Sequence, residues 1–143
     1  MNTFSITDTG LVRMNNQDSV FCEENAIGSF PNLFLVADGM GGHKAGVEAV
    51  KQQVIDSKCV TPVGVLEEAV AAANDTIYEM ASSNSELEGM GTTLVGVTVF
   101  EDTAFVVNVG DSRLYQMKDS LNQITVDHSL VEEMVQSGEI QKD

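Results

Sequence analysis

The segment LFLVADGMGGHKAG, residues 33–46, brings together residue types that could do chemistry. An apolar run ends in Asp38, and a glycine-rich stretch then leads to His43. Glycine lets the backbone bend sharply and expose its carbonyl groups. A carbonyl from this glycine-rich stretch, beside a carboxylate, offers the hard oxygen ligands that Mg²⁺ and Mn²⁺ prefer. The same residues also fit an ordinary connection between a strand and a helix, so the segment alone leaves both interpretations open.

Nucleotide-binding glycine loops do not fit this segment. A Walker loop ends in Gly-Lys-Ser or Gly-Lys-Thr, whereas Lys44 follows His43 and precedes Ala45. A dinucleotide-binding fingerprint needs a third glycine where Lys44 stands. The spacing therefore excludes both kinds of phosphate loop.

Two charged residues outside this segment could complete a site. Arg13 is the only Lys or Arg in the first 43 residues. Its planar guanidinium could clamp two phosphate oxygens, or it could form a surface ion pair. Asp111, in VGDSRLY, fits a tight hairpin between two apolar strands, and it could also face Asp38 across the edge of the sheet. We interpret a further segment, GMGTT at residues 89–93, as a turn that enters a strand.

The two histidines allow structural and chemical interpretations. His43 could supply a proton to a leaving oxygen if a phosphate and a metal ion lay nearby. A lone histidine is also commonly structural. His128 is more simply part of a helix start.

Periodicity predicts the elements that must position these residues. Strands are expected at residues 3–8, 19–23 and 32–37, followed by a helix that buries Val47, Val50 and Val54 on one face. A break at 61–64 precedes a long helix over 65–81. The residues expected on the buried side of that helix are Leu66, Ala69, Val70, Ala73, Ile77 and Met80.

The second half of the chain is rich in β-branched and aromatic residues. Strands are expected at 92–100, 103–109, 113–117 and 122–125, with turns at 101–102 and 118–120. A short helix is expected to begin at a cap within residues 127–129 and to end near Gly138. This order predicts an α+β fold with helices packed on an antiparallel sheet.

Composition limits the classes of protein to which the chain could belong. The chain has 143 residues with 43% hydrophobic content, which indicates a single domain over residues 1–143. A net charge of −15 argues against nucleic acid and anionic membranes as partners. No stretch predicts a membrane span or a secretion signal. Cys22 and Cys59 fit no metal spacing, so we expect reduced thiols and a cytoplasmic location.

Four motifs in order resemble the metal-dependent protein phosphatases of type 2C, the PPM family. They are GLVRMNNQDS (10–19), VADGMGGHKAG (36–46), GMGTTL (89–94) and VGDSRLY (109–115), and DHSLVEEMVQSGEI (127–140) matches a fifth segment. The chain looks most like the stand-alone bacterial branch. The resemblance implies an α-β-β-α sandwich of two antiparallel sheets with flanking helices, truncated at its C-terminus.

The resemblance also implies a metal site for Mn²⁺ or Mg²⁺. Asp38 would bridge two ions, and Gly39 would offer its carbonyl to one of them. Asp18 would belong to the same metal site, and Asp111 matches a ligand of a third, weaker metal. The family usually has Glu where this chain has Gln17, which can hydrogen-bond water but brings no charge.

By the same resemblance, Arg13 would hold the substrate phosphate and His43 would act as general acid toward a serine or threonine oxygen. Water activated by the metals would attack phosphorus in line. The partners implied are phosphorylated proteins and a cognate Ser/Thr kinase.

The family pattern continues beyond the point where this sequence stops. An SDG-type segment and a final DN pair normally complete one catalytic metal position, and no such candidates follow Asp143. The expectation is therefore a phosphatase domain represented by its N-terminal part. The alternatives are a non-catalytic pseudophosphatase that binds phosphoprotein or kinase, and a metal-binding sandwich that acts on another phosphoester.

Overall fold

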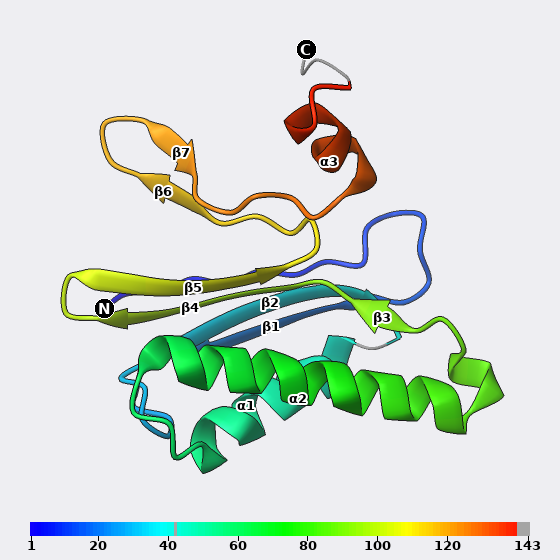
Figure 1. The fold of residues 1–143 in the computed structure, drawn as a ribbon, viewed down its shortest axis with the longest axis horizontal. Helices are drawn as coiled ribbons and strands as arrows, with labels where there is room; N and C mark the ends of the chain where they lie inside the picture. The colour runs from blue at the N-terminus through cyan, green and yellow to red at the C-terminus, as the bar shows by residue number, and fades with distance from the viewer. Residues whose placement is uncertain (42, 140–143) are drawn as a thin grey trace.

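Two helices cover one face of a five-stranded antiparallel sheet in the computed structural model, which describes residues 1–41 and 43–139 (Figure 1). The helices are α1 (His43–Asp56) and α2 (Pro62–Ser83). The strands are β1 (Asp18–Glu23), β2 (Leu33–Met40), β3 (Gly91–Thr92), β4 (Leu94–Phe100) and β5 (Thr103–Val109). Their order is β1-β2-β4-β5, with β3 paired to the end of β2.

The core lies between this sheet and the two helices. Leu33, Leu35 and Ala37 alternate along β2 and are all fully buried, as expected for strand residues that share one face. From α1, the residues Val47, Val50 and Val54 pack into the same cluster. The predicted buried face of this helix is therefore confirmed.

The long helix α2 begins earlier than its hydrophobic pattern predicts. The expected break at residues 61–64 is its first turn, because Pro62 suits that turn and Thr61 caps it by accepting a hydrogen bond from the Gly64 N–H at 3.2 Å. The expected burial is confirmed for Leu66, Ala69 and Ala73.

The expected burial is wrong for Met80, near the end of α2, which is 37% exposed. Val70 and Ile77 are half-buried, and Val70 packs against the core cluster. A single 3-10 turn, η1 (Ser85–Leu87), follows the helix within the expected polar loop.

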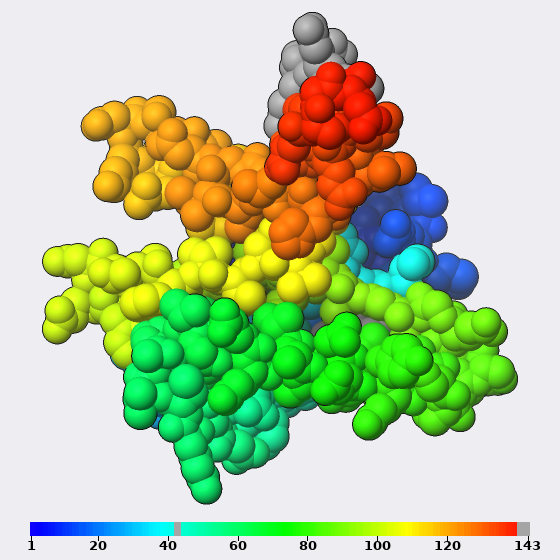
Figure 2. Space-filling view, viewed as in Figure 1, coloured from blue at the N-terminus to red at the C-terminus, as the bar shows by residue number. Residues whose placement is uncertain are grey.

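A second, smaller sheet and a third helix lie on the other side of the main sheet. The sheet is a hairpin of β6 (Tyr115–Met117) and β7 (Leu121–Gln123), and the helix is α3 (Leu130–Gln136), capped by Ser129. Figure 2 shows the hairpin and α3 projecting as lobes from the body of the molecule. Two antiparallel sheets with helices outside them agree with the expected fold class.

Two sequence predictions about local structure are wrong. Residues 3–8 form no strand, because they make no ladder pairing with any described strand, and Phe4 and Ile6 are 87% and 77% exposed. Residues 110–114 do not close a hairpin between their flanking strands. β5 pairs with β4 while β6 pairs with β7, and Gly110, at φ +96°, redirects the chain between the two sheets.

The β4–β5 hairpin is confirmed. Phe100 lies opposite Thr103, so Glu101 and Asp102 form a two-residue turn. The turn at 118–120 is confirmed by the pairing of Met117 with Leu121. Within the described residues, no helix is both long and apolar enough to span a membrane.

Candidate functional site

Asp18 and Asp38 lie directly opposite each other on neighbouring strands. They are partners in the β1–β2 ladder, and both are exposed. Like charges placed opposite each other in a ladder destabilise it. No Lys or Arg in the described ranges forms an ion pair with either carboxylate. Two unpaired carboxylates on one face of the sheet edge are suited to a shared cation.

The strand that carries Asp38 continues to Met40, so Asp38 does not mark its end as expected. β3 pairs with this last part of β2, with Gly39 opposite Thr92. A Cβ at Gly39 would lie 2.6 Å from the Thr92 hydroxyl oxygen and 2.7 Å from the Gly91 carbonyl oxygen. Glycine is therefore required at position 39 by the close approach of β3.

Asp111, which is distant from Asp38 in sequence, lines the same pocket as Asp38. A shallow pocket of about 370 Å³ is lined by Asp38, Gly39, Met40, residues 91–93 and Asp111. Asp111 is exposed and follows β5 directly after Gly110. Asp111 therefore shares a pocket with Asp38, as one of its two interpretations expected, although it does not belong to a tight hairpin.

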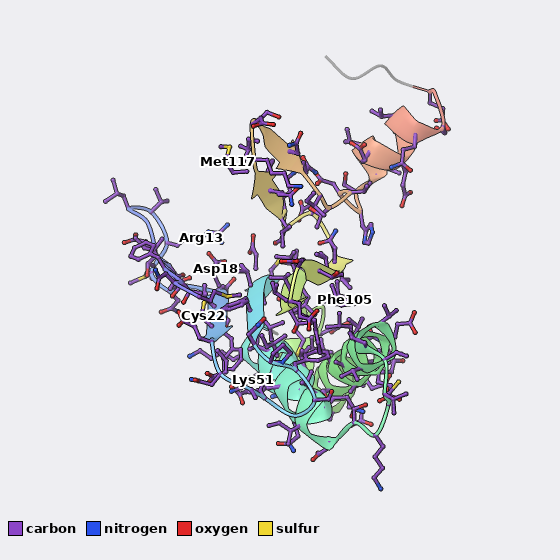
Figure 3. The ribbon with its side chains drawn as sticks, turned by 90° about the vertical axis from the view of Figure 1, so that its left-hand side faces the viewer. Arg13, Asp18, Cys22, Lys51, Phe105 and Met117 are labelled. Carbon is purple, nitrogen blue, oxygen red and sulfur yellow. The ribbon has the colours of Figure 1, made fainter. Side chains whose placement is uncertain are left out.

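Arg13 lies on the exposed N-terminal segment, beside this pocket. Its own pocket is lined by Arg13, Met14, Asn15, Gln17 and Met40, and Met40 also lines the pocket of Asp38. Figure 3 shows Arg13 and Asp18 on the same side of the molecule. Arg13 makes no ion pair within the part of the chain that the structure describes, so the alternative of a surface salt bridge finds no support.

The two histidines differ in what the structure describes. His43 is the first residue of α1, and its side chain lies outside the described part of the structure. His128 comes just before the Ser129 cap of α3, as expected. The imidazole Nδ1 of His128 accepts a hydrogen bond from the Gly110 N–H at 3.3 Å. The backbone N–H of His128 donates to the Gly110 carbonyl at 2.9 Å.

The two groups whose pKa values are shifted, Arg113 and Glu23, lie outside the pocket of Asp38. Arg113 follows Ser112 and donates from Nε to Asp127 Oδ1 at 2.8 Å, and its hydrogen bonds to Asp127 raise its pKa above the ordinary value. At the far end of β1, the backbone and side-chain N–H groups of Asn25 donate to Glu23 and lower its pKa. Arg113 therefore anchors the β6–β7 hairpin to the chain before α3 and does not face the pocket.

The carboxylates fit part of a site for a hard divalent cation. Their oxygens are the preferred ligand type, and the three aspartates are Asp18, Asp38 and Asp111. Among the described residues, no three His, Cys, Asp or Glu side chains lie close enough together to hold one metal ion. The donor set is therefore incomplete within this part of the chain.

Comparison with known proteins is consistent with this geometry. Residues 3–134 match the family described as protein phosphatase 2C. The chain is 39% identical to the serine/threonine phosphatase stp of Listeria innocua over 149 aligned residues, which cover 96% of this chain and 58% of that protein. It is 38% identical to the serine/threonine protein phosphatase PstP of Mycobacterium tuberculosis, covering 94% of this chain and 26% of that protein.

Solved structures agree with the fold. The serine/threonine phosphatase Stp1 from Staphylococcus aureus superposes with a TM-score of 0.81 at 32% identity, covering 95% of this chain and 57% of that one. The catalytic domain of PstP in complex with two manganese ions superposes with a TM-score of 0.75 at 37% identity, covering 94% and 59%.

These matches show that the chain belongs to the protein phosphatase 2C family, which is metal-dependent. The chain spans 58% of the length of the Listeria relative.

Proposed function

We propose that this chain carries part of the active site of a metal-dependent Ser/Thr phosphoprotein phosphatase. The observation that carries the proposal is the pairing of Asp18 with Asp38 across β1 and β2, beside a pocket that Asp111 also lines. Membership of the protein phosphatase 2C family supports the reaction class.

In this proposal, Asp38, Asp18 and the Gly39 carbonyl hold Mn²⁺ or Mg²⁺, and Asp111 belongs to a further cation position. The chemistry that such cations supply is the activation of water for attack on phosphorus and the neutralisation of charge on its oxygens. The manganese ions of the PstP structure support the choice of metal type. Gln17, next to Asp18, offers an amide that can orient water without adding charge.

Arg13 and His43 act on the substrate in this proposal. Arg13 binds two phosphate oxygens through its guanidinium fork, which its lack of an ion pair in the described chain leaves available. His43 donates a proton to the serine or threonine oxygen as the phosphate ester bond breaks. The substrates are phosphorylated proteins, a cognate Ser/Thr kinase supplies them, and the reaction takes place in the cytoplasm.

A second function is favoured by the incomplete donor set. Since the described residues provide no group of three metal ligands, the 143 residues alone could bind phosphoprotein or kinase without turnover. Under either function we propose that the isolated chain hydrolyses phosphopeptide very slowly, even with millimolar Mn²⁺. Removal of one electrostatic stabiliser commonly costs about 10²–10³ in rate.

A chimera distinguishes the two functions. Residues 1–143 replace the aligned segment of the Listeria innocua phosphatase, and hydrolysis of a phosphothreonine peptide is measured with Mn²⁺. The phosphatase proposal expects turnover, which Asp38→Asn in the chimera removes. A chimera that is folded by circular dichroism and binds Mn²⁺ but shows no turnover, beside an active Listeria protein, would favour the non-catalytic function.

A further inference from the structure

Two hydroxyl groups join the strand of Asp38 to the loop of Asp111. Thr93 Oγ1 and Ser112 Oγ lie 2.6 Å apart, which is a short distance for a hydrogen bond between hydroxyls. Thr93 stands between β3 and β4, and Ser112 follows Asp111 in the connection between the two sheets. Both side chains are half-buried, so the contact is sheltered from bulk water.

Thr93 is itself fixed to the backbone of Asp38. The Thr93 N–H donates to the Asp38 carbonyl at 2.7 Å, and the Asp38 N–H donates to Thr93 Oγ1 at 3.1 Å. A hydroxyl has one proton to donate and two lone pairs to accept with. Thr93 Oγ1 can therefore accept from Asp38 and still share a hydrogen bond with Ser112.

The loop that carries Ser112 is held on its other side as well. A Cβ at Gly110 would lie 2.8 Å from Thr93 Cγ2, so only glycine allows the loop to come this close. The hydrogen bonds between Gly110 and His128 tie the same loop to the residue before the cap of α3. Asp111 lies between these two fixed residues, Gly110 and Ser112.

Nothing in the described chain neutralises Asp111 beside Asp38. Both line one pocket, and neither forms an ion pair in that part of the molecule. Mutual repulsion acts to move the loop away from β2 when no cation is bound. The hydroxyl contact opposes that movement, because it links Ser112 to the residue that is bonded to Asp38.

We propose that Thr93 and Ser112 are positioning residues that hold the Asp111 carboxylate beside Asp38 before a cation binds. This inference rests on the proposed metal site. Partners that orient metal ligands typically change metal affinity by about 10–100-fold when they are removed. Their effect should therefore be visible in metal binding by the chain itself.

The test uses the full 143-residue chain with two readouts. The first is the order parameter of the Asp111 amide from ¹⁵N relaxation in the presence of chelator. The second is Mn²⁺ affinity from water-proton relaxation. The variants are Ser112→Ala, Ser112→Thr, Thr93→Val and the double variant Thr93→Val/Ser112→Ala. The matched control is Ser82→Ala, which removes an exposed hydroxyl from α2.

Ser112→Ala should lower the Asp111 order parameter from roughly 0.85 to below about 0.6. It should weaken Mn²⁺ binding about tenfold. The melting temperature in chelator should stay close to that of the parent. Ser112→Thr keeps the hydroxyl and should restore both readouts. The double variant should bind Mn²⁺ no more weakly than Thr93→Val, because the two changes break the same link.

Parental loop order and parental affinity in Ser112→Ala would overturn the inference. A looser loop with parental Mn²⁺ affinity would also overturn it, because the contact would then serve structure alone. If the parent chain binds no Mn²⁺, affinity is measured in the Listeria chimera, and no Mn²⁺ binding there would mean that the proposed metal site fails. The order parameter, measured without metal, then decides whether the hydroxyls hold Asp111.

Discussion

The Asp18 and Asp38 carboxylates face each other across an antiparallel ladder with no cationic side chain paired to either in the described structure. Such a pair of like charges costs a sheet about 0.2–1 kcal/mol and becomes favourable only when a cation lies between the charges. The local sequence therefore lowers the stability of the metal-free chain at the point where it would bind a metal.

This relationship predicts opposite effects of Asp38→Asn with and without Mn²⁺. In chelator, the variant should melt slightly higher than the parent, because the repulsion with Asp18 is removed. With Mn²⁺, the parent should gain stability by mass action and the variant should not. Thermal melts in both conditions measure this, with Asp102→Asn in the β4–β5 turn as the control. A variant that melts lower in chelator and keeps its Mn²⁺ response would contradict the assignment.

Arg13 is predicted to contribute to phosphate binding and not to metal binding. In the Listeria chimera, Arg13→Ala should raise the KM for phosphopeptide about tenfold or more, since a hydrogen bond to a charged group contributes roughly 1.5–3 kcal/mol. Arg13→Lys should recover only part of this loss, because an ammonium cannot form the two parallel hydrogen bonds. Mn²⁺ affinity, measured by calorimetry, should be unchanged. Lost Mn²⁺ binding with a parental KM would show that the role is misassigned.

The face of the main sheet that points away from α1 and α2 gives a prediction about solubility. Val36 is 40% exposed there, and Phe34, Val97 and Val106 on the neighbouring ladder positions are half-buried. Exposed apolar patches of this kind favour association. The isolated chain should bind a hydrophobic dye and self-associate in light scattering at micromolar concentration.

A variant on this face gives that prediction a control. Val36→Thr keeps a β-branched side chain on β2 and should reduce both dye binding and association. The exposed Val60, which lies between α1 and α2, provides the matched change Val60→Thr and should alter neither. A parent chain that is monomeric in light scattering and gives no increase in dye fluorescence would refute the prediction.

Sequence periodicity predicts the helices and hairpins that are formed by residues close together in the chain. Val47, Val50 and Val54 repeat at helical spacing, and the Glu101–Asp102 turn joins two strands that are adjacent in sequence, so short-range patterns are enough to find them. The strand expected at residues 3–8 fails because alternation does not supply the backbone pairing that makes a strand. The motif resemblance correctly indicated the family, since it depends on residue identity at spaced positions and not on periodicity.

The contact between Thr93 and Ser112 has no local signal. The two residues are 19 positions apart in sequence, and GMGTT is interpreted from its residues as an ordinary turn. Only the register that places Gly39 opposite Thr92, together with the turn at Gly110, brings the hydroxyls together. The pairing of Asp18 with Asp38 likewise depends on the register of the β1–β2 ladder. Neither of the two motifs that contain these residues predicts that register by itself.

The last prediction concerns His43, which stands five residues after Asp38 and has a different proposed task. A general acid matters most when the leaving group is a poor one, such as a serine alkoxide, and little when it is an acidic phenol. In the Listeria chimera, His43→Ala should therefore lower kcat by about 10²-fold or more on a phosphoserine peptide and far less on nitrophenyl phosphate. Mn²⁺ affinity should remain close to that of the parent chimera. Asp38→Asn provides the contrast, because it should remove activity on both substrates together with metal binding. Equal losses on the two substrates in His43→Ala, with Mn²⁺ binding intact, would show that His43 is not the acid and that its place at the start of α1 is structural.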